Sequence, residues 1–326
     1  ELLRAAAQAR DLVLGVTLLA SIAFLPEGLV GLWARLEPFV PWRGSRRAVP
    51  APLPTAAPAM TLGAWRSRAA AGQLEVAGLT KEFGGVAAVR KVSFRAAAGE
   101  IVGLIGPNGA GKTTLFNMIA GALPPTAGEL RYDGRPVTGF PPAEMARLGI
   151  ARSFQITSLF PALGAAENLR TATHLRAASR FAEALLRTAR FRAQESGIET
   201  VIAEILAIVG LAAHAATPAQ ALSYGDQRRL EVGIALATGC RLLLLDEPCA
   251  GLNPTETQEI RALLLRLRDA GYGIILIEHD MHLVMEICDR VVVLSHGEKI
   301  AEGLPKEVAA DPAVIEAYLG AAPADA

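Results

Sequence analysis

The residues between Gly106 and Thr114 have the types and the spacing needed to hold phosphate groups. They match the pattern G-x-x-x-x-G-K-[ST] and are Gly106, Pro107, Asn108, Gly109, Ala110, Gly111, Lys112, Thr113 and Thr114. Small residues let backbone N–H groups turn inward around an anion, and a helix beginning near Lys112 points its positive end at it. Lys112 is expected to reach the β- and γ-phosphates of ATP, and the Thr113 hydroxyl to ligate Mg²⁺. A chance glycine-rich turn is the alternative, which the apolar run before the motif disfavours.

Two acids follow the apolar run Leu242–Leu245 and complement the phosphate loop. A buried strand ending there would place Asp246 beside the metal and Glu247 toward the γ-phosphate. Glu247 is then the natural general base for an attacking water. Acid pairs at strand ends are also common surface features, but a phosphate loop in the same chain favours the catalytic interpretation.

His279 and Gln155 are the further candidates for the hydrolytic site. His279 follows the run 273–278, which is predicted to lie parallel to the strand ending at Asp246, so its imidazole should approach the same crevice. Gln155 falls between the α/β core and a helical block, in a position to touch Mg²⁺ or water. Taken alone, each is better explained as a surface or capping residue, so both assignments depend on the family resemblance given below.

A second anion site is predicted at Ser223, Gly225 and Asp226. Ser223 and the backbone amides after it stand at the start of a helix expected over about 226–238, where N–H groups are unpaired. An ordinary Ser N-cap with Asp226 in the first turn is the alternative. A single subunit that binds one triphosphate needs only the helix start near Lys112. The helix start at Ser223 would therefore serve the ATP site of a partner subunit.

The elements that must position these residues read as an α/β fold. Three short apolar runs, 101–106, 241–247 and 273–278, are typical of buried parallel strands covered on both faces. A stretch rich in Ala, Leu and Arg over about 164–239 predicts a helical block. The expected architecture is an α/β core, within a domain over 73–320, that carries a helical subdomain.

The bulk composition excludes some classes of protein. The 326 residues are 52% hydrophobic, and 32 basic residues balance 32 acidic ones. This balance gives no sign of a nucleic-acid surface. The three cysteines, Cys240, Cys249 and Cys288, have no metal-ligand spacing, so reduced structural thiols are expected.

The chain before residue 73 differs from the rest. Within residues 1–34, the apolar stretch Leu12–Trp33 would span about 33 Å as a helix, enough for a membrane segment. A signal peptide and a buried helix hairpin are the alternatives. Residues 35–72 carry six prolines and six arginines, which predict a disordered linker on the cytoplasmic side. Because the chain opens with Glu1, we expect it to be a piece of a longer polypeptide, and 321–326 form a tail.

Several motifs in order resemble the ATP-binding cassette (ABC) family over about 73–320. The stretch Leu222–Arg229 resembles the family's signature, and Pro248–Asn253 looks like its D-loop. The resemblance implies a P-loop NTPase core, an antiparallel β subdomain, an α-helical subdomain and a signature that completes the opposite subunit's ATP site. It also implies an adenine-stacking role for Phe83, with a core aromatic as the alternative. Tyr224 departs from the family, where glycine is commoner, but its backbone N–H remains available.

Within that family the chain looks most like the Liv-type ATPases of branched-chain amino acid importers. The residues that support this resemblance are Ala151–Gln155, Leu159–Pro161, Leu222–Gly225, Ala250–Asn253, Glu278–Val284 and Ala317–Gly320. The resemblance implies a second ABC ATPase subunit, identical or different, together with transmembrane permease subunits and an external substrate-binding protein. The chain would work at the cytoplasmic face of a bacterial inner membrane, and its N-terminus resembles the end of a permease, which suggests a fusion. A lipid- or lipopolysaccharide-export ATPase and a soluble non-transport ABC protein are the alternatives.

Overall fold

The computed structural model describes residues 62–65, 72–152, 159–176 and 188–319. The chain divides into two units, Glu1–Ala56 and Ala57–Ala326, and every described residue belongs to the second. The predicted membrane segment within 1–34, its likeness to a permease, and the tail 321–326 therefore lie outside the described residues. So does the predicted linker, apart from residues 62–65 and 72.

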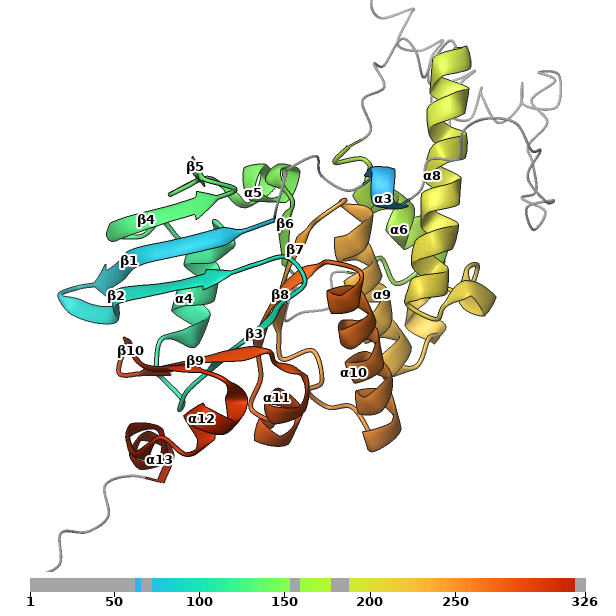
Figure 1. The fold of residues 1–326 in the computed structure, drawn as a ribbon. Coiled ribbons are helices and arrows are strands. Elements are labelled where there is room, and N and C mark those ends of the chain that lie inside the picture. Colours follow the sequence, from blue (N-terminus) through green and yellow to red (C-terminus); the bar gives the residue numbers. More distant parts are fainter. Residues whose placement is uncertain (1–61, 66–71, 153–158, 177–187, 320–326) are drawn as a thin grey trace, which may run out of the picture. The chain divides into compact units, whose positions relative to one another are not determined.

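A six-stranded sheet contains all three of the predicted strands. Its strand order is β10-β9-β3-β8-β7-β6 (Figure 1). The strands are β3 (Ile101–Ile105), β6 (Ile150–Arg152), β7 (Leu242–Asp246), β8 (Gly273–Ile277), β9 (Arg290–Ser295) and β10 (Glu298–Gly303). Neighbours run parallel except for β9 and β10, which confirms the mostly parallel α/β sheet. Because Asp246 pairs with Ile277, the carboxyl ends of β7 and β8 reach the same edge.

Both faces of this sheet are covered, which explains the uninterrupted apolar runs. Every residue of β3, β7 and β8 is buried. Alternate residues face opposite sides, so Ile101 and Ile105 enter one apolar core while Val102 and Leu104 enter another. The first core includes side chains of α10 (Pro254–Asp269) and α11 (Met281–Ile287), and the second includes those of α4 (Lys112–Ile119).

A four-stranded antiparallel sheet packs against the second core. Its order is β2-β1-β4-β5, and the strands are β1 (Leu74–Phe83), β2 (Val86–Ala96), β4 (Ala127–Tyr132) and β5 (Arg135–Pro136). Leu74, Val76 and Leu130 are buried in the core that α4 shares. The antiparallel β subdomain is thereby confirmed, and it adjoins the helix that follows the phosphate loop.

The predicted helical block is confirmed where the structure describes it. It contains α6 (Ala165–Thr173), α8 (Ala189–Ile208) and α9 (Tyr224–Ala237), with short 3-10 turns η1 (Ala212–His214) and η2 (Ala219–Ala221). Helix α9 begins two residues earlier than expected, because Ser223 caps it. The remaining helices are α5 (Pro142–Leu148), which leads into β6, and α12 (Pro305–Ala309) and α13 (Pro312–Leu319) after β10.

A short helix, α3 (Leu62–Trp65), corrects the prediction that residues 35–72 lack regular structure. Leu62 and Trp65 are buried in the same core as the helical block, and the Trp65 indole Nε1 donates to the Ala237 carbonyl at 2.8 Å. The six prolines end at Pro58, so nothing prevents a helical turn in the four residues that follow Thr61. Two large apolar side chains within those four residues make packing favourable.

Across the described ranges, no helix combines the length and the apolar character that a membrane crossing needs. The predicted crossing falls in residues 1–34, which that finding does not cover.

Candidate nucleotide site

The phosphate loop connects β3 to α4, and its backbone requires glycine at two positions. Gly106 has φ +148°, and a Cβ there would lie 2.1 Å from the Leu294 carbonyl oxygen. Gly111 is the N-cap of α4 with φ +95°, and a Cβ there would lie 2.4 Å from the Ala88 carbonyl oxygen. Side chains are excluded at both ends, so the backbone itself forms the wall of the loop.

Lys112 lies across the mouth of this loop. Its Nζ donates to the Gly106 carbonyl at 2.6 Å and to the Pro107 carbonyl at 3.0 Å. Burial lowers the pKa of this ammonium group, while the carboxylates of Glu247 and Asp246 act in the opposite direction. The ammonium group is thus held by two carbonyl groups of the phosphate loop. It also lies near Asp246 and Glu247, the two acids at the end of β7.

Glu247 and His279 face each other at the ends of β7 and β8. The Glu247 N–H donates to the Ile277 carbonyl at 2.9 Å, and Glu247 has φ +49°, a strained value for a side chain of this size. The His279 Nε2 lies 2.9 Å from the Glu247 Oε1. A carboxylate and an imidazole in contact are suited to orienting a water molecule and managing its proton.

One cavity of about 310 Å³ brings most of the predicted site residues together. It is lined by Ala88, Asn108, Gly109, Ala110, Gly111, Lys112, Thr113, Thr114, Glu247, Ile277 and His279. The phosphate loop therefore faces the general-base candidate across a single space. Ala88, on β2, is a lining residue that no motif singled out.

Asp246 is buried, and within the described residues its carboxylate has one hydrogen-bond partner, Arg152. The Arg152 Nη2 donates to Asp246 Oδ2 at 3.1 Å, and the same guanidinium lies 5.2 Å from the Phe116 ring centre. Burial raises the pKa of Asp246, and Arg152 opposes that shift. No sequence motif pairs Arg152 with Asp246, because 94 residues separate them.

The same surroundings fit a divalent cation. Asp246 Oδ1 is buried without a hydrogen-bond partner, and Thr113 stands in the first turn of α4, where it lines the phosphate-loop cavity. Among the described residues, no group of three or more His, Cys, Asp or Glu side chains could hold a metal alone. A Mg²⁺ ion bound by one or two protein oxygens plus substrate phosphates needs no such group.

Glu278 is a further residue at this edge, and the motifs assigned it no role. Its Oε1 accepts from the Cys249 N–H at 3.0 Å and its Oε2 from the His279 N–H at 3.3 Å. Burial raises the pKa of this carboxyl group, and these backbone hydrogen bonds oppose the shift. Glu278 thereby ties the segment after Glu247 to the backbone of His279.

The second predicted anion site lies at the start of α9, away from this cavity. Ser223 Oγ accepts from the Asp226 N–H at 3.0 Å, as an N-cap does, and Asp226 pairs with Arg229. The Gly225 N–H donates to Glu256 Oε1 at 3.1 Å. None of the predicted residues here lines the cavity of the phosphate loop. The two predicted anion sites therefore lie apart within one chain.

Two predicted residues stand apart from both sites. Phe83 is 49% exposed, with the Lys81 Nζ 5.2 Å from its ring centre, so the alternative of a core aromatic is wrong. Its ring is free to stack on a planar ligand, and that role stays a prediction. Gln155 lies outside the described residues, so its predicted contact with Mg²⁺ or water stays a prediction as well.

The C-terminal helix α13 contacts the phosphate loop from behind. Burial raises the pKa of the Tyr318 hydroxyl, and a hydrogen bond with the Gly106 backbone opposes the shift. The first glycine of the loop therefore has a support from the last described helix of the chain.

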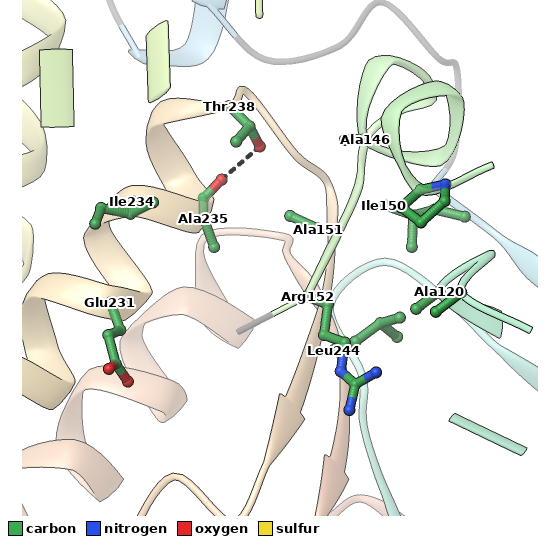
Figure 2. Close-up of a pocket in the computed structure, with 12 residues that line it drawn as sticks. Ala120, Ala146, Ile150, Ala151, Arg152, Glu231, Ile234, Ala235, Thr238 and Leu244 are labelled. Atoms are coloured by element: carbon green, nitrogen blue, oxygen red, sulfur yellow. Dashed lines mark hydrogen bonds between the residues drawn. The ribbon is translucent and has the colours of Figure 1, made fainter. Parts of the chain in front are cut away.

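A mostly apolar groove of about 200 Å³ lies beside Arg152 (Figure 2). It is lined by Ala120, Ala122, Pro142, Ala146, Ile150, Ala151, Arg152, Glu231, Ile234, Ala235, Thr238 and Leu244. These residues come from the α/β core and from α9, so the groove spans both parts. Glu231 is its buried acid: Oε2 accepts from Arg228 at 3.0 Å, while Oε1 has no hydrogen-bond partner in the part of the chain that the structure describes.

Comparisons with known proteins agree with this geometry. The family model described as "ABC transporter" matches residues 89–250, and one described as "Branched-chain amino acid ATP-binding cassette transporter" matches 298–324. The branched-chain amino acid transport ATP-binding proteins BraF of Pseudomonas aeruginosa and LivG of Escherichia coli (strain K12) are each 44% identical over 250 residues. These alignments cover 76% of this chain and 98% of each relative.

More distant similarities point the same way. The lipopolysaccharide export ATP-binding protein LptB of Acidithiobacillus ferridurans is 36% identical over 247 residues, which cover 76% of this chain and 96% of that protein. A crystal structure of an ATP-binding cassette of an ABC transporter in its ADP conformation has a TM-score of 0.67 and 31% identity. That similarity covers 76% of this chain and 98% of the other.

Proposed function

The chain belongs to the ATP-binding proteins of ABC transporters, and from this membership we propose that it powers the import of branched-chain or related amino acids. Members of this family hydrolyse ATP, and this chain is an ATP hydrolase of that type. The amino-acid substrate is supported by the relatives, because the transport proteins BraF and LivG are 44% identical and the export protein LptB 36%. The observation that carries the ATP-hydrolysing part of the proposal is the cavity in which the phosphate loop faces Glu247 and His279.

In the proposed reaction, two cassettes close on two ATP molecules. Each triphosphate lies between the phosphate loop of one subunit and the start of α9, led by Ser223, of the other. Thr113, Asp246 and Gln155 would hold Mg²⁺, and the cation would neutralise phosphate charge. Lys112 contacts the β- and γ-phosphates and stabilises the charge that gathers on the γ-phosphate.

Glu247 accepts the proton of a water placed in line with the γ-phosphate. The His279 Nε2, 2.9 Å from the Glu247 carboxylate, holds that carboxylate in position before ATP binds, and its N–H would turn to the γ-phosphate oxygens once ATP is bound. Phe83, exposed on β1, stacks on the adenine ring. The resulting closure and reopening drive transport through the partner subunits.

The proposed partners are a second ABC ATPase subunit, transmembrane permease subunits and an external substrate-binding protein. The groove of Figure 2 is the surface we assign to the permease, since it joins the α/β core to α9 beside Arg152. We place the working protein at the cytoplasmic face of the inner membrane, with residues 1–34 inserted as the end of a fused permease. Protease protection of residues 1–34 in membrane vesicles tests that placement, and full digestion from outside the bilayer contradicts it.

Replacing Glu247 by Gln tests the catalytic assignment. The variant should bind ATP and pair with a second copy, while turnover falls by about 10²–10⁴, the usual contribution of a general base. Asp269→Asn, an exposed acid at the end of α10, is the matched control and should hydrolyse ATP normally. Near-normal hydrolysis by the Glu247→Gln protein contradicts the proposal.

A transport measurement tests the substrate. Cells that lack the gene should lose uptake of labelled leucine, isoleucine or valine, and the gene should restore it. Normal uptake combined with a defect in the outer-membrane lipopolysaccharide would favour the export alternative. That alternative is supported by the 36% identity to LptB. A soluble ribosome- or DNA-bound ABC protein would show neither defect.

A further inference from the structure

The start of α9 already holds an anion in this chain, the carboxylate of Glu256. Glu256 Oε1 accepts from the Gly225 N–H at 3.1 Å, and its Oε2 accepts from the Asn253 N–H at 3.1 Å. The Asn253 side chain in turn accepts from the Glu256 N–H at 3.0 Å. Both carboxylate oxygens are therefore engaged, one by the start of α10 and the other by the start of α9.

The contact is close, so it is not an incidental surface bond. A Cβ on Gly225 would lie 2.7 Å from Glu256 Cγ and 2.8 Å from its Oε1, so any larger residue there would have to push the Glu256 side chain aside. Tyr224 packs on the same segment, since a Cβ on Gly251 would lie 3.3 Å from the Tyr224 ring. The Arg228 guanidinium lies 5.0 Å from the centre of that ring and donates to its hydroxyl at 2.5 Å. Residues 251–256 are thus fitted against the start of α9.

In this arrangement, one of the two donors proposed to bind the γ-phosphate is free and the other is taken. Ser223 Oγ accepts from the Asp226 N–H, so its hydroxyl remains able to donate outward. The Gly225 N–H, in contrast, is already committed to a negatively charged acceptor, and such bonds are stronger than neutral ones. A phosphate arriving at this helix start must displace the carboxylate, and it meets the repulsion of a like charge while doing so.

We propose that Glu256 is an internal competitor of ATP: its carboxylate holds the Gly225 N–H until the γ-phosphate on a second cassette replaces it. The inference rests on the proposed pairing of two cassettes. Glu256 acts through the Gly225 amide and is a positioning residue, since it lies outside the phosphate-loop cavity. It sets the ATP concentration at which pairing occurs, and it leaves the step of bond cleavage to Glu247.

The test compares ATP-dependent pairing of the full chain with and without Glu256→Gln, both in the Glu247→Gln background that slows turnover. Glutamine keeps the length of the side chain and an oxygen acceptor but removes the charge. The ATP concentration for half-maximal pairing, followed by light scattering, should fall by about threefold to tenfold, since a charged acceptor is roughly twice as strong as a neutral one. Asp269→Asn is the matched control, about 20 Å away along α10, and should not change it.

Two further measurements separate this role from a structural one. With Glu247 intact, Glu256→Gln should lower the KM for ATP while kcat changes less than twofold. In the absence of nucleotide, amide hydrogen exchange in 223–227 should be faster in Glu256→Gln than in the unaltered chain. An unchanged or higher ATP requirement, with pairing intact in the Glu247→Gln parent, overturns the role of Glu256. Absence of ATP-dependent pairing in the parent itself overturns the proposed pairing instead.

Discussion

Replacing Arg152 by Met should destabilise the protein far more than loss of an exposed ion pair does. Arg152 supplies the one hydrogen bond that Asp246 makes among the described residues, and the Asp246 side chain is 1% exposed against 15% for Arg152. Methionine keeps most of the side-chain length over Phe116 but leaves the carboxylate without a cation. The result is a buried charge with no compensation.

The magnitude follows from the distance. Two unit charges 3.1 Å apart attract by about 5 kcal/mol at an effective dielectric constant of about 20. Part of this offsets the desolvation of both groups, and breaking one side of a buried pair typically costs about 3–5 kcal/mol. Because Arg152 retains some exposure to solvent, we expect the free energy of unfolding to fall by about 3 kcal/mol, the lower end of that range.

Urea unfolding followed by circular dichroism measures the change, with a double-mutant cycle to isolate the pair. Arg131→Met is the matched control, because Arg131 pairs with Glu129 at 3.0 Å but is 47% exposed, and it should cost at most about 1 kcal/mol. Adding Asp246→Asn to Arg152→Met should recover most of the lost stability, since the unpaired charge is then gone. A cost below about 1 kcal/mol for Arg152→Met, or no recovery in the double variant, refutes the reasoning.

Three other outcomes are expected. Phe83→Ala should weaken ATP binding by about 1–3 kcal/mol, the range of base stacking, while Phe83→Trp should retain it; equal affinities in calorimetry would exclude stacking. Gly111→Ala should abolish ATP binding, because its Cβ would lie 2.4 Å from the Ala88 oxygen; normal binding of a fluorescent ATP analogue would contradict this. Burial raises the pKa of both Cys249 and Cys288 to about 12, so these thiols should resist disulfide reagents at pH 8 until urea is added, with about one in ten thousand ionised.

The sequence predicted those parts of the fold whose causes are local. Strands β3, β7 and β8 are buried on both faces, and this appears directly as uninterrupted apolar runs. The phosphate loop is a contiguous motif, and its glycines are needed because the backbone has positive φ angles and close carbonyl neighbours there. Glu247 and His279 could be placed together because the carboxyl ends of parallel strands share an edge.

The parts that escaped prediction depend on contacts between distant segments. Arg152 pairs with Asp246 across 94 residues, and Glu256 reaches Gly225 across 31. Neither pairing has a spacing rule, because each requires the positions of two separate elements to be known. Glu278 likewise reaches the Cys249 N–H, which lies 29 residues away.

Helix α3 indicates that the folded domain begins before residue 73. Resemblance to the family starts near residue 73, yet Leu62 and Trp65 complete an apolar core of the domain, and Trp65 ties up a carbonyl at the last turn of α9. An expressed fragment that starts at residue 73 would lose a buried tryptophan, a loss comparable to the roughly 3–5 kcal/mol of a Trp→Ala change. This hydrogen bond joins α3 to the end of α9 opposite to the one that Ser223 caps.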